Sequence, residues 1–187
     1  MNLSTPLFEG SLIRLGALDH DKDAQIESAW THDPAFMRMM YTEAMHPLSV
    51  FQLKKKYEAL EKELDESKDL FHFRIRAREN ERLLGFGEIR RISWPNGTGE
   101  ICLGLGSPAD WRKGYGHEAL GLMIRYAFSE INLYRLAAVI PEYNQPALAL
   151  FTKTGFSPEV CRRQALARDG RRWDAWHYGL LANEWIG

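Results

Sequence analysis

Two glycines, Gly114 and Gly116, open a helical run in the segment DWRKGYGHEALGLMIRYAF (residues 110–128). Glycine lets a backbone turn tightly and lets a ligand approach main-chain N–H groups without a Cβ in the way. A helix N-terminus adds free N–H donors and about half a unit of positive charge. With Arg112 and Lys113 beside them, these glycines indicate an anion site suited to a pyrophosphate. The simpler alternative to an anion site is an ordinary glycine turn in which Arg112 and Lys113 are only solvated surface cations.

Strand-like and helical runs alternate around this segment, which predicts a mixed α/β fold. The dipeptide Asn96-Gly97 between two alternating runs predicts an antiparallel hairpin. Gly155 closes the second of two helices in the C-terminal half. The predicted strands cover residues 7–18, 70–76, 83–92, 100–105, 135–140, 160–167 and 175–181, and the predicted C-terminal helices cover 116–130 and 145–154.

The N-terminal part of the chain is predicted to be helical. Asp19 opens a polar-to-helical region that reaches Met40, and Asp33-Pro34 marks a helix start within it. An apolar stripe with helical spacing then predicts an amphipathic helix of three to four turns. A coiled coil is the alternative for this stripe, but two heptads are too few, so core packing is favoured. The stripe consists of Leu53, Tyr57, Leu60 and Leu64.

Composition limits the class of protein. A chain of 187 residues with 45% hydrophobic residues fits one globular domain spanning 1–187. A formal net charge of -1 gives no reason to expect nucleic acid or an anionic membrane as a partner. Cys102 and Cys161 are far apart and form no metal-binding pair, so a reducing compartment is expected. The first ten residues lack signal-peptide features and no apolar run reaches about 18 residues, which predicts a soluble, cytoplasmic protein.

Two other glycine motifs are weaker explanations of this region. A Walker A loop is excluded because no glycine loop here ends in Lys followed by Ser or Thr. The stretch 104–109 (GLGSPA) matches G-x-G-x-x-[GA], but Pro108 and Asp110 delay the helix that a dinucleotide fingerprint must open.

The segment CLGLGSPADWRKGYGHEALGLMIRYAF resembles the acyl-CoA-binding segment of the GCN5-related N-acetyltransferases (GNAT), whose core pattern [Q/R/W]-x-x-G-x-[G/A] is filled by residues 111–116. Downstream, YNQPALALFTKTGF is similar to a second family motif, with Asn144, Gly155 and Phe156 in its places. The opening LFEGSLIRLGAL and the closing RRQALARDGRRWDAWHYGLLANEW resemble the RimJ/RimL-type branch. The resemblance thus covers nearly the whole chain.

This resemblance implies a central, mostly antiparallel sheet of about six to seven strands with a splayed parallel pair, flanked by helices. The strands at 100–106 and 135–140 are expected to diverge, and pantetheine is expected to lie in the gap like an added strand. Acetyl-CoA is the implied co-substrate, with no metal. Its expected contacts are Gly104, Leu105 and Gly106 for pantetheine and Trp111, Arg112, Lys113, Gly114, Tyr115, Gly116 and His117 for the pyrophosphate.

Acetyl transfer to an amine requires that a base remove a proton, because most free amines are protonated at pH 7. Glu100 is the first candidate, since it starts the strand that carries the thioester, and Glu88 on the neighbouring strand is the second. A carboxylate on a solvated strand face is the plainer interpretation of either. The tetrahedral oxyanion is expected to be held by a backbone N–H near Leu103 or Gly104.

The chain departs from the family at Phe151, where many members place a tyrosine that protonates the departing thiolate. Phenylalanine has no proton to donate, so Phe151 is expected only to pack against the cofactor. Tyr143 and Tyr115 are conceivable substitutes, although neither lies at a spacing that a family motif specifies. Asn144 is expected to hydrogen-bond the cofactor or the acceptor.

The function indicated is acetyl transfer from acetyl-CoA to a primary amine, either a protein N-terminus or a small amine, by direct attack. A non-catalytic acyl-CoA-binding module and an interaction protein that merely keeps the fold are the alternatives. The six histidines lack metal-ligand spacing and are interpreted as structural or surface residues. The resemblance to the family favours a homodimer. The sequence does not specify the acceptor.

Overall fold

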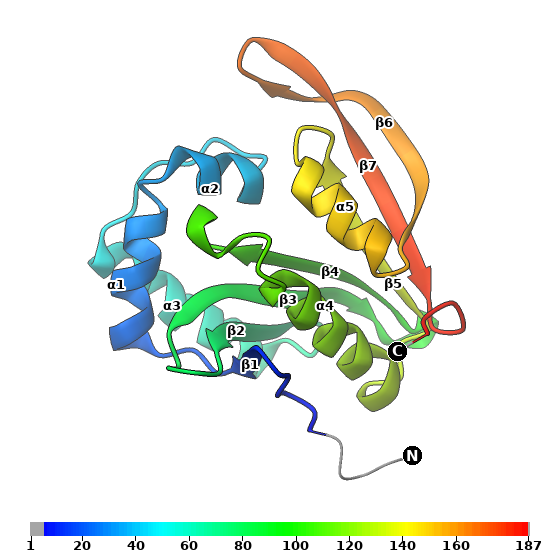
Figure 1. The fold of residues 1–187 in the computed structure, drawn as a ribbon, viewed down its shortest axis with the longest axis horizontal. Coiled ribbons are helices and arrows are strands. Elements are labelled where there is room, and N and C mark those ends of the chain that lie inside the picture. Colours follow the sequence, from blue (N-terminus) through cyan, green and yellow to red (C-terminus); the bar gives the residue numbers. More distant parts are fainter. Residues whose placement is uncertain (1–5, 187) are drawn as a thin grey trace.

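The computed structural model, which describes residues 6–186, contains one seven-stranded sheet with the strand order β1-β2-β3-β4-β5-β7-β6 (Figure 1). All neighbouring strands are antiparallel except β4 and β5, which are parallel. The predicted mostly antiparallel sheet with one parallel pair is therefore confirmed. The strands are β1 (Ile13–Gly16), β2 (Phe71–Ala77), β3 (Leu83–Ser93), β4 (Thr98–Leu105), β5 (Arg135–Pro141), β6 (Ser157–Arg168) and β7 (Arg171–Leu181).

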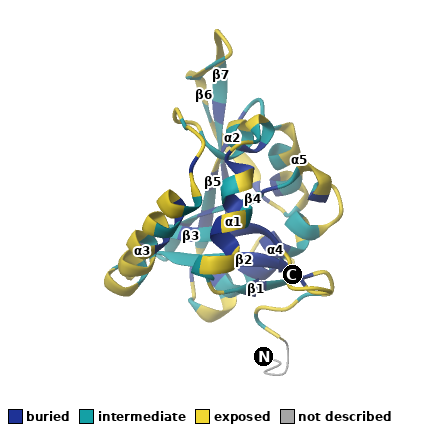
Figure 2. Ribbon diagram, turned by 90° about the vertical axis from the view of Figure 1, so that its left-hand side faces the viewer, coloured by how far each residue is buried: buried dark blue, intermediate teal, exposed yellow. Residues whose placement is uncertain are grey.

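Five α-helices cover the two faces of the sheet. Figure 2 shows α3 on one side, with α4 and α5 on the other. A π-helical turn continues α4 over Tyr126–Glu130, so the predicted helix over 116–130 changes its hydrogen-bond pattern partway. The helices are α1 (His20–Trp30), α2 (Pro34–Met40), α3 (Val50–Glu66), α4 (Tyr115–Arg125) and α5 (Gln145–Lys153), and the 3₁₀ turns are Trp94–Asn96 and Pro108–Asp110.

The first two N-terminal helices begin where the sequence predicts, and capping side chains fix the starts of all three. Asp19 accepts from the backbone at the start of α1, and Asp33 does the same for α2. Ser49 and Gln52 form a capping box at α3. The amphipathic stripe of α3 packs through Leu53 and its neighbours into a small apolar cluster with α1, which is the core packing that we expected.

Strand β2 is buried on both faces. Its apolar side joins the main core beneath α4, as the alternation predicts. Its polar side is covered by α1 and α3, where Arg74 is 1% exposed. Arg74 Nη1 lies 2.7 Å from Glu27 Oε2, and Arg76 Nη2 lies 2.9 Å from Asp23 Oδ2. These α1 carboxylates neutralise the two arginines, which allows a strand with an amphipathic sequence to be buried.

The parallel pair of strands diverges after a short paired stretch. Only Thr98, Gly99 and Glu100 of β4 are in register with β5, whereas both strands continue well beyond that point. Residues 101–105 and 138–141 therefore form the two sides of a gap, which confirms the predicted splay. β5 remains paired with β7 along its whole length. The β6–β7 hairpin extends beyond the sheet towards α2 (Figure 1).

No helix within residues 6–186 combines the length and the apolar character that crossing a bilayer requires.

Candidate active site

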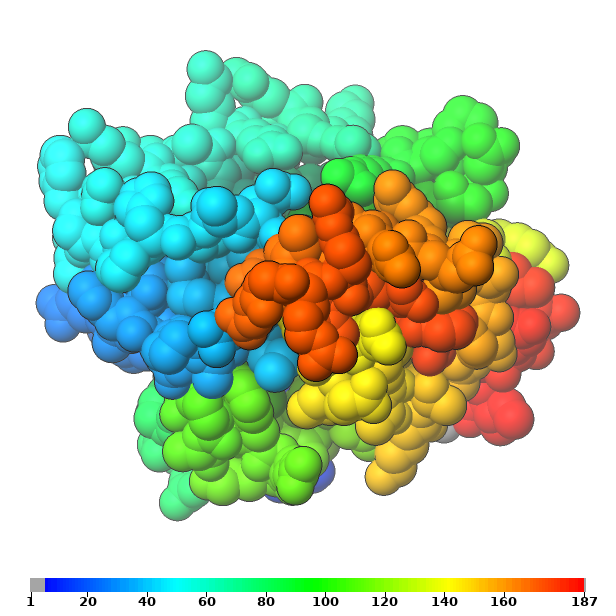
Figure 3. Space-filling model, turned by 90° about the horizontal axis from the view of Figure 1, so that it is seen from above, coloured from blue at the N-terminus to red at the C-terminus, as the bar shows by residue number. Residues whose placement is uncertain are grey.

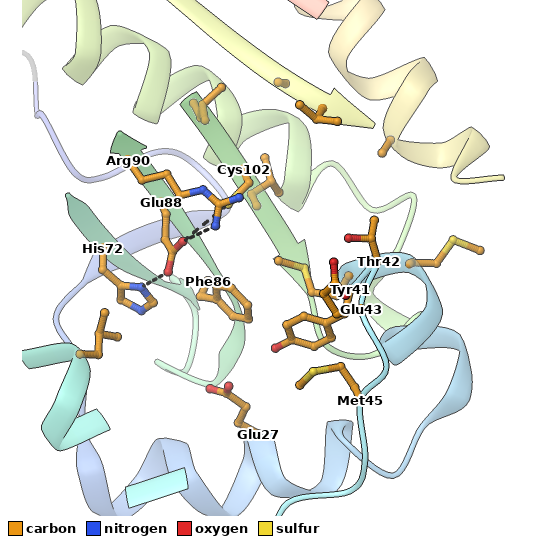
Figure 4. A pocket seen from close by; sticks show the side chains of 18 of the residues that line it. Glu27, Tyr41, Thr42, Glu43, Met45, His72, Phe86, Glu88, Arg90 and Cys102 are labelled. Carbon is orange, nitrogen blue, oxygen red and sulfur yellow. Dashed lines mark hydrogen bonds and ion pairs between the residues drawn. The ribbon is translucent and has the colours of Figure 1, made fainter. Parts of the chain in front are cut away.

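A cavity of about 650 Å³ lies where the gap between β4 and β5 meets the N-terminal helices (Figure 4). Its walls come from α1, the end of α2 and its connection to α3, α3 itself, strands β2 to β5, and α5 with its N-cap. Figure 3 shows the segment that follows α2 beside the tip of the β6–β7 hairpin. Arg168 of that tip donates to the carbonyl oxygens of Tyr41 (2.8 Å) and Thr42 (3.2 Å), which fixes this edge of the cavity.

The backbone of β4 presents alternate residues to the gap. Gly106 N–H donates to Leu84 O of β3 (2.9 Å), and Gly104 is in register with β3. Because backbone groups alternate in direction along a strand, those of Leu103 and Leu105 face β5 instead. The Leu105 carbonyl oxygen indeed accepts from Trp111 Nε1 (3.1 Å) rather than from β3. The N–H of Leu103 therefore points into the gap, and that of Gly104 does not.

Gly104 and Gly106 have a packing role in this strand. A Cβ on Gly104 would overlap the Met40 sulfur, and one on Gly106 would overlap the Trp30 indole. The absence of side chains at these positions lets α1 and α2 approach β4. Of the three predicted pantetheine contacts, Leu105 is the one whose backbone faces the gap.

The glycine loop (residues 111–117) ends at the N-terminus of α4. Gly114 is the N-cap residue with φ +90°, a left-handed conformation that favours glycine, and Arg112 also has a positive φ of +60°. Among the α-helices of residues 6–186, α4 alone begins without a side-chain cap. The N–H groups of its first turn are therefore free for an anion.

Gly116 faces the gap. An added Cβ would lie 3.5 Å from Leu150 Cδ2 of α5 and 3.8 Å and 3.9 Å from the Cδ1 atoms of Leu105 and Leu103. These are ordinary van der Waals distances, so the protein itself does not require glycine here. A Cβ at this position would nevertheless take up space between β4 and α5, and glycine leaves that space open.

Charged neighbours hold the loop in place. Arg82 makes two 2.8 Å hydrogen bonds to the carboxylate of the buried Asp110, immediately before the loop. The hydrogen bond from Arg82 holds the pKa of Asp110 below its usual range. Glu118 accepts hydrogen bonds from Ser11 and the backbone leading into β1. Burial raises the pKa of Glu118, but these hydrogen bonds outweigh it and lower the pKa overall.

Three side chains from adjacent strands form a row on the cavity side of the sheet. Glu88 of β3 lies between His72 of β2 and Cys102 of β4. His72 Nδ1 is 3.1 Å from Glu88 Oε1, and Cys102 Sγ is 3.8 Å from Oε2 (Figure 4). Burial acts to raise the pKa of Glu88, but His72, Arg90 and Cys102 together lower it. The carboxylate is thus ionised at neutral pH.

The tautomer of His72 follows from its environment. Its side chain is 5% exposed, and Nε2 has no hydrogen-bond partner among the described residues. The ionised carboxylate of Glu88 can only accept hydrogen bonds, so the nitrogen that faces it must be the donor. The arrangement therefore favours the proton on Nδ1, which donates to Glu88. His72, which was expected to be a structural or surface residue like the other histidines, is buried and meets Glu88 through the register of β2 and β3.

Glu100 lies on the same face of the sheet as Glu88 but is not among the residues that line the cavity. Its carboxylate accepts two hydrogen bonds from Arg91 Nη1, at 2.9 and 3.0 Å. It sits at the last paired position of β4 and β5, before the gap opens. The position of Glu88 is therefore better suited to chemistry in the gap.

Two residues from the sequence prediction line the cavity at α5, one as the N-cap of this helix and one within it. Asn144 Oδ1 caps the helix by accepting from Ala147 N (3.1 Å), and Nδ2 donates to Met39 O (3.0 Å). Both ends of this amide are therefore engaged in holding α5 against α2. Phe151 is 4% exposed and packs edge-on against Phe156, with ring centroids 5.0 Å apart. No group of three or more potential metal-ligating side chains occurs within residues 6–186.

Comparisons with known proteins agree with this geometry. Residues 13–157 match the family model described as acetyltransferase (GNAT) domain. The uncharacterized N-acetyltransferase p20 of Bacillus licheniformis is 31% identical over 115 residues, which cover 62% of this chain and 64% of that protein. An N-acetyltransferase 9-like protein of Caenorhabditis briggsae is 26% identical over 133 residues, covering 66% and 64%. The chain thus aligns with somewhat less than two thirds of each of these relatives.

Solved structures match over nearly the full chain. The spermidine N-acetyltransferase from Vibrio cholerae, in complex with CoA and spermine, has a TM-score of 0.80 at 19% identity. The match covers 95% of this chain and 100% of that one. A probable acetyltransferase of known structure has a TM-score of 0.78 at 21% identity, covering 94% and 96%. At these identities the likeness establishes the fold.

Proposed function

This chain belongs to the GNAT acetyltransferase family, and we propose that it transfers the acetyl group of acetyl-CoA to a primary amine by direct attack. The observation that carries the proposal is the divergence of β4 from β5 beside the uncapped start of α4. A gap lined by backbone groups suits the amides of pantetheine, and the free N–H groups of the glycine loop suit its pyrophosphate.

In this proposal the glycine loop, residues 111–117, holds the pyrophosphate and β4 holds the pantetheine arm. The thioester then lies beside Leu103, whose N–H donates to the oxyanion of the tetrahedral intermediate. Gly116 leaves room for the arm between β4 and α5.

We assign the removal of the amine proton to Glu88 rather than Glu100. Glu88 lines the cavity, is ionised, and is oriented by His72. Because the pKa of Glu88 is lowered, the protonated carboxyl group gives up its proton readily at neutral pH. The proton taken from the amine therefore passes on to solvent at the cavity mouth. His72 acts here as a positioning residue.

A covalent acetyl-enzyme is disfavoured at Cys102, the cysteine that lines the cavity. Burial, with the charge of Glu88, raises the pKa of this thiol to about 12. A thiol in that state is a poor nucleophile at neutral pH, because the thiolate is the reactive form.

The acceptor in this proposal is a small amine that fits the cavity. Four acidic and three basic side chains line the cavity, namely Glu27, Glu43, Glu63, Glu88, Lys56, Arg74 and Arg90. The Vibrio cholerae relative acts on spermidine and occurs in a dodecameric form. Polyamines therefore belong in the first set of acceptors tested, beside a monoamine and a peptide with a free N-terminus, and an assembly of several copies is part of the proposal.

Release of free thiol from acetyl-CoA in the presence of each amine tests the function. We expect Glu88→Gln to lower kcat by about 10²-fold or more, the usual range for general acid–base groups, while acetyl-CoA still stabilises the folded protein. Glu100→Gln is the matched comparison, since this carboxylate lies on the same sheet face outside the cavity. Stabilisation by acetyl-CoA without turnover of any amine would favour a non-catalytic binding module. If Glu100→Gln is impaired and Glu88→Gln is not, the assignment of the base is wrong.

A further inference from the structure

Residues 37–45 (MRMMYTEAM) hold four of the six methionines of the chain. Three of them line the cavity and are half-buried, and we call these three the methionine wall: Met39, Met40 and Met45. Methionine side chains are flexible and polarizable, and they are common on surfaces that bind apolar groups of varied shape. Figure 4 shows Met45 across the cavity from Glu88. One side of the cavity is therefore adaptable and apolar.

The methionine wall continues onto the sheet beside the proposed base. Phe86 lines the cavity two residues before Glu88, on the same face of β3. Its ring stacks on that of His72, with centroids 5.8 Å apart and an angle of 17° between the planes. Gly104 of β4 is in register with Phe86, and a Cβ on Gly104 would overlap the Met40 sulfur. Phe86 and Met40 therefore make an apolar surface next to Glu88 on the cavity side of the sheet.

The opposite direction along β3 leads to a positive charge. Arg90 also lines the cavity, two residues after Glu88 on the same face, and its Nη1 lies 3.4 Å from Glu88 Oε2. Glu88 thus has an apolar neighbour on one side and a guanidinium group on the other. A second positive charge on a molecule bound at Glu88 would face either the apolar surface or Arg90.

The other charged residues that line the cavity do not compensate for this. Glu27 is buried and already bound, because its Oε2 lies 2.7 Å from Arg74 Nη1. Glu43, Lys56 and Glu63 are exposed, so water solvates them and salt screens their charges. The interior of the cavity therefore suits a molecule with one cationic group, placed at Glu88.

We propose that the acceptor is a primary monoamine with an apolar body, alkyl or aromatic, a substrate class that rests on the proposed acetyl transfer. Its amino group meets Glu88, and its apolar body lies on Phe86 and the methionine wall. The nitrogen lone pair forms the new C–N bond, and the C–S bond breaks with its electron pair remaining on sulfur. Of the two protons that the ammonium group loses, one leaves through Glu88 to solvent and one ends on the sulfur of CoA. The products are the N-substituted acetamide and the free thiol of CoA.

Two physical effects select this class of acceptor. The apolar body gains free energy by leaving water, and an aromatic body gains further from its contacts with methionine sulfur. A diamine or polyamine of similar length loses this gain, because burying an ammonium group without a partner is costly. The methionine wall thus distinguishes chains of equal length by the charge at their far end.

Hexylamine and hexamethylenediamine provide the test, because they share a six-carbon chain and differ in the second amino group. With the wild-type protein and acetyl-CoA, we expect kcat/KM for hexylamine to exceed that for the diamine by about tenfold or more. The diamine has more amino groups that can react, so their number cannot produce this difference. Phenethylamine should be a substrate as well, and spermidine and a peptide with a free N-terminus complete the set.

A carboxylate placed in the methionine wall should change the preference. Met45→Glu supplies a partner for the second ammonium group, so the ratio of kcat/KM for hexylamine to that for the diamine should fall by about fivefold or more. His46→Glu is the matched control, since it adds the same charge one residue along the chain, at an exposed position outside the cavity lining. It should leave the ratio within about twofold of wild type.

The outcomes separate this inference from the proposed function. An equal or higher kcat/KM for the diamine or for spermidine overturns the inference and leaves acetyl transfer intact, as does turnover of the peptide alone. Equal changes of the ratio in Met45→Glu and His46→Glu overturn the role of the methionine wall. The comparison of amines with the wild-type protein stands whether or not Met45→Glu folds. If the wild-type protein turns over none of these amines, the proposed function itself is wrong.

Discussion

Replacing Gly116 with alanine separates the stability of the free protein from its affinity for acetyl-CoA. The residue lies in the first turn of α4 and the added methyl meets its neighbours at 3.5 Å or more, so the folded chain accommodates it. Alanine is a better helix former than glycine by up to about 1 kcal/mol, with less of this expressed in a first turn. The free energy of unfolding without ligand should therefore stay level or rise slightly.

The same methyl group enters the gap between β4 and α5 where pantetheine is proposed to lie, so binding should weaken. Acetyl-CoA at about 100 times Kd stabilises a folded protein by about 2.7 kcal/mol. A tenfold weaker Kd at that concentration leaves about 1.4 kcal/mol. For a chain of this size the difference lowers the ligand-induced rise in Tm by about 3–5 °C.

Thermal unfolding with and without acetyl-CoA measures both effects in one experiment. Gly121→Ala is the matched control: it lies in the same helix, and its added Cβ meets nothing within 4 Å. It should gain helix stability and keep the full response to ligand. Gly114 is less suitable, because its φ of +90° makes any side chain strained whatever the ligand does. Undiminished binding of acetyl-CoA by Gly116→Ala would refute the placement of the pantetheine arm.

Two further predictions concern the polar groups under the cavity. His72→Leu removes the hydrogen bond that helps to keep the pKa of Glu88 low, so burial should raise that pKa. Activity is lost as the pH falls through the pKa of this carboxyl in the folded protein. The variant should therefore lose activity at a higher pH than wild type. A pH profile of kcat/KM checks this, and an unmoved acid limb contradicts it. Arg74→Met leaves the buried carboxylate of Glu27 without its ion-pair partner and removes the second arginine near Asp23, which keeps Arg76. This should cost about 3–5 kcal/mol of folding free energy in urea titrations, and a loss below 1 kcal/mol would contradict this reasoning.

The local features of the chain were predictable because short-range chemistry determines them. Asp33-Pro34 starts a helix, and Asn96-Gly97 lies in the turn between β3 and β4. The glycine loop before α4 was predicted for the same reason, since a helix start with free N–H groups needs only neighbouring residues to form. The family motifs then indicated which strands diverge, and the register of β4 with β5 confirms it.

The distinction between Glu88 and Glu100 needed the tertiary structure. Both carboxylates lie on the same face of adjacent strands, and the sequence favoured Glu100 because it starts β4. The gap opens only after Glu100, however, and Arg91 holds that side chain outside the cavity. A strand pattern specifies which face a residue occupies but not how far along the sheet the neighbouring strand separates.

The sequence by itself determined the fold family, the helix caps and the loop suited to a pyrophosphate, because each depends on residues close together in the chain. Only the tertiary structure decided which side chains meet at the cavity. His72 meets Glu88 across 16 positions, and Arg168 fixes Tyr41 across 127. These contacts arise from strand register and from the packing of α2 against β4, and such long-range geometry leaves no periodic signal in a single sequence.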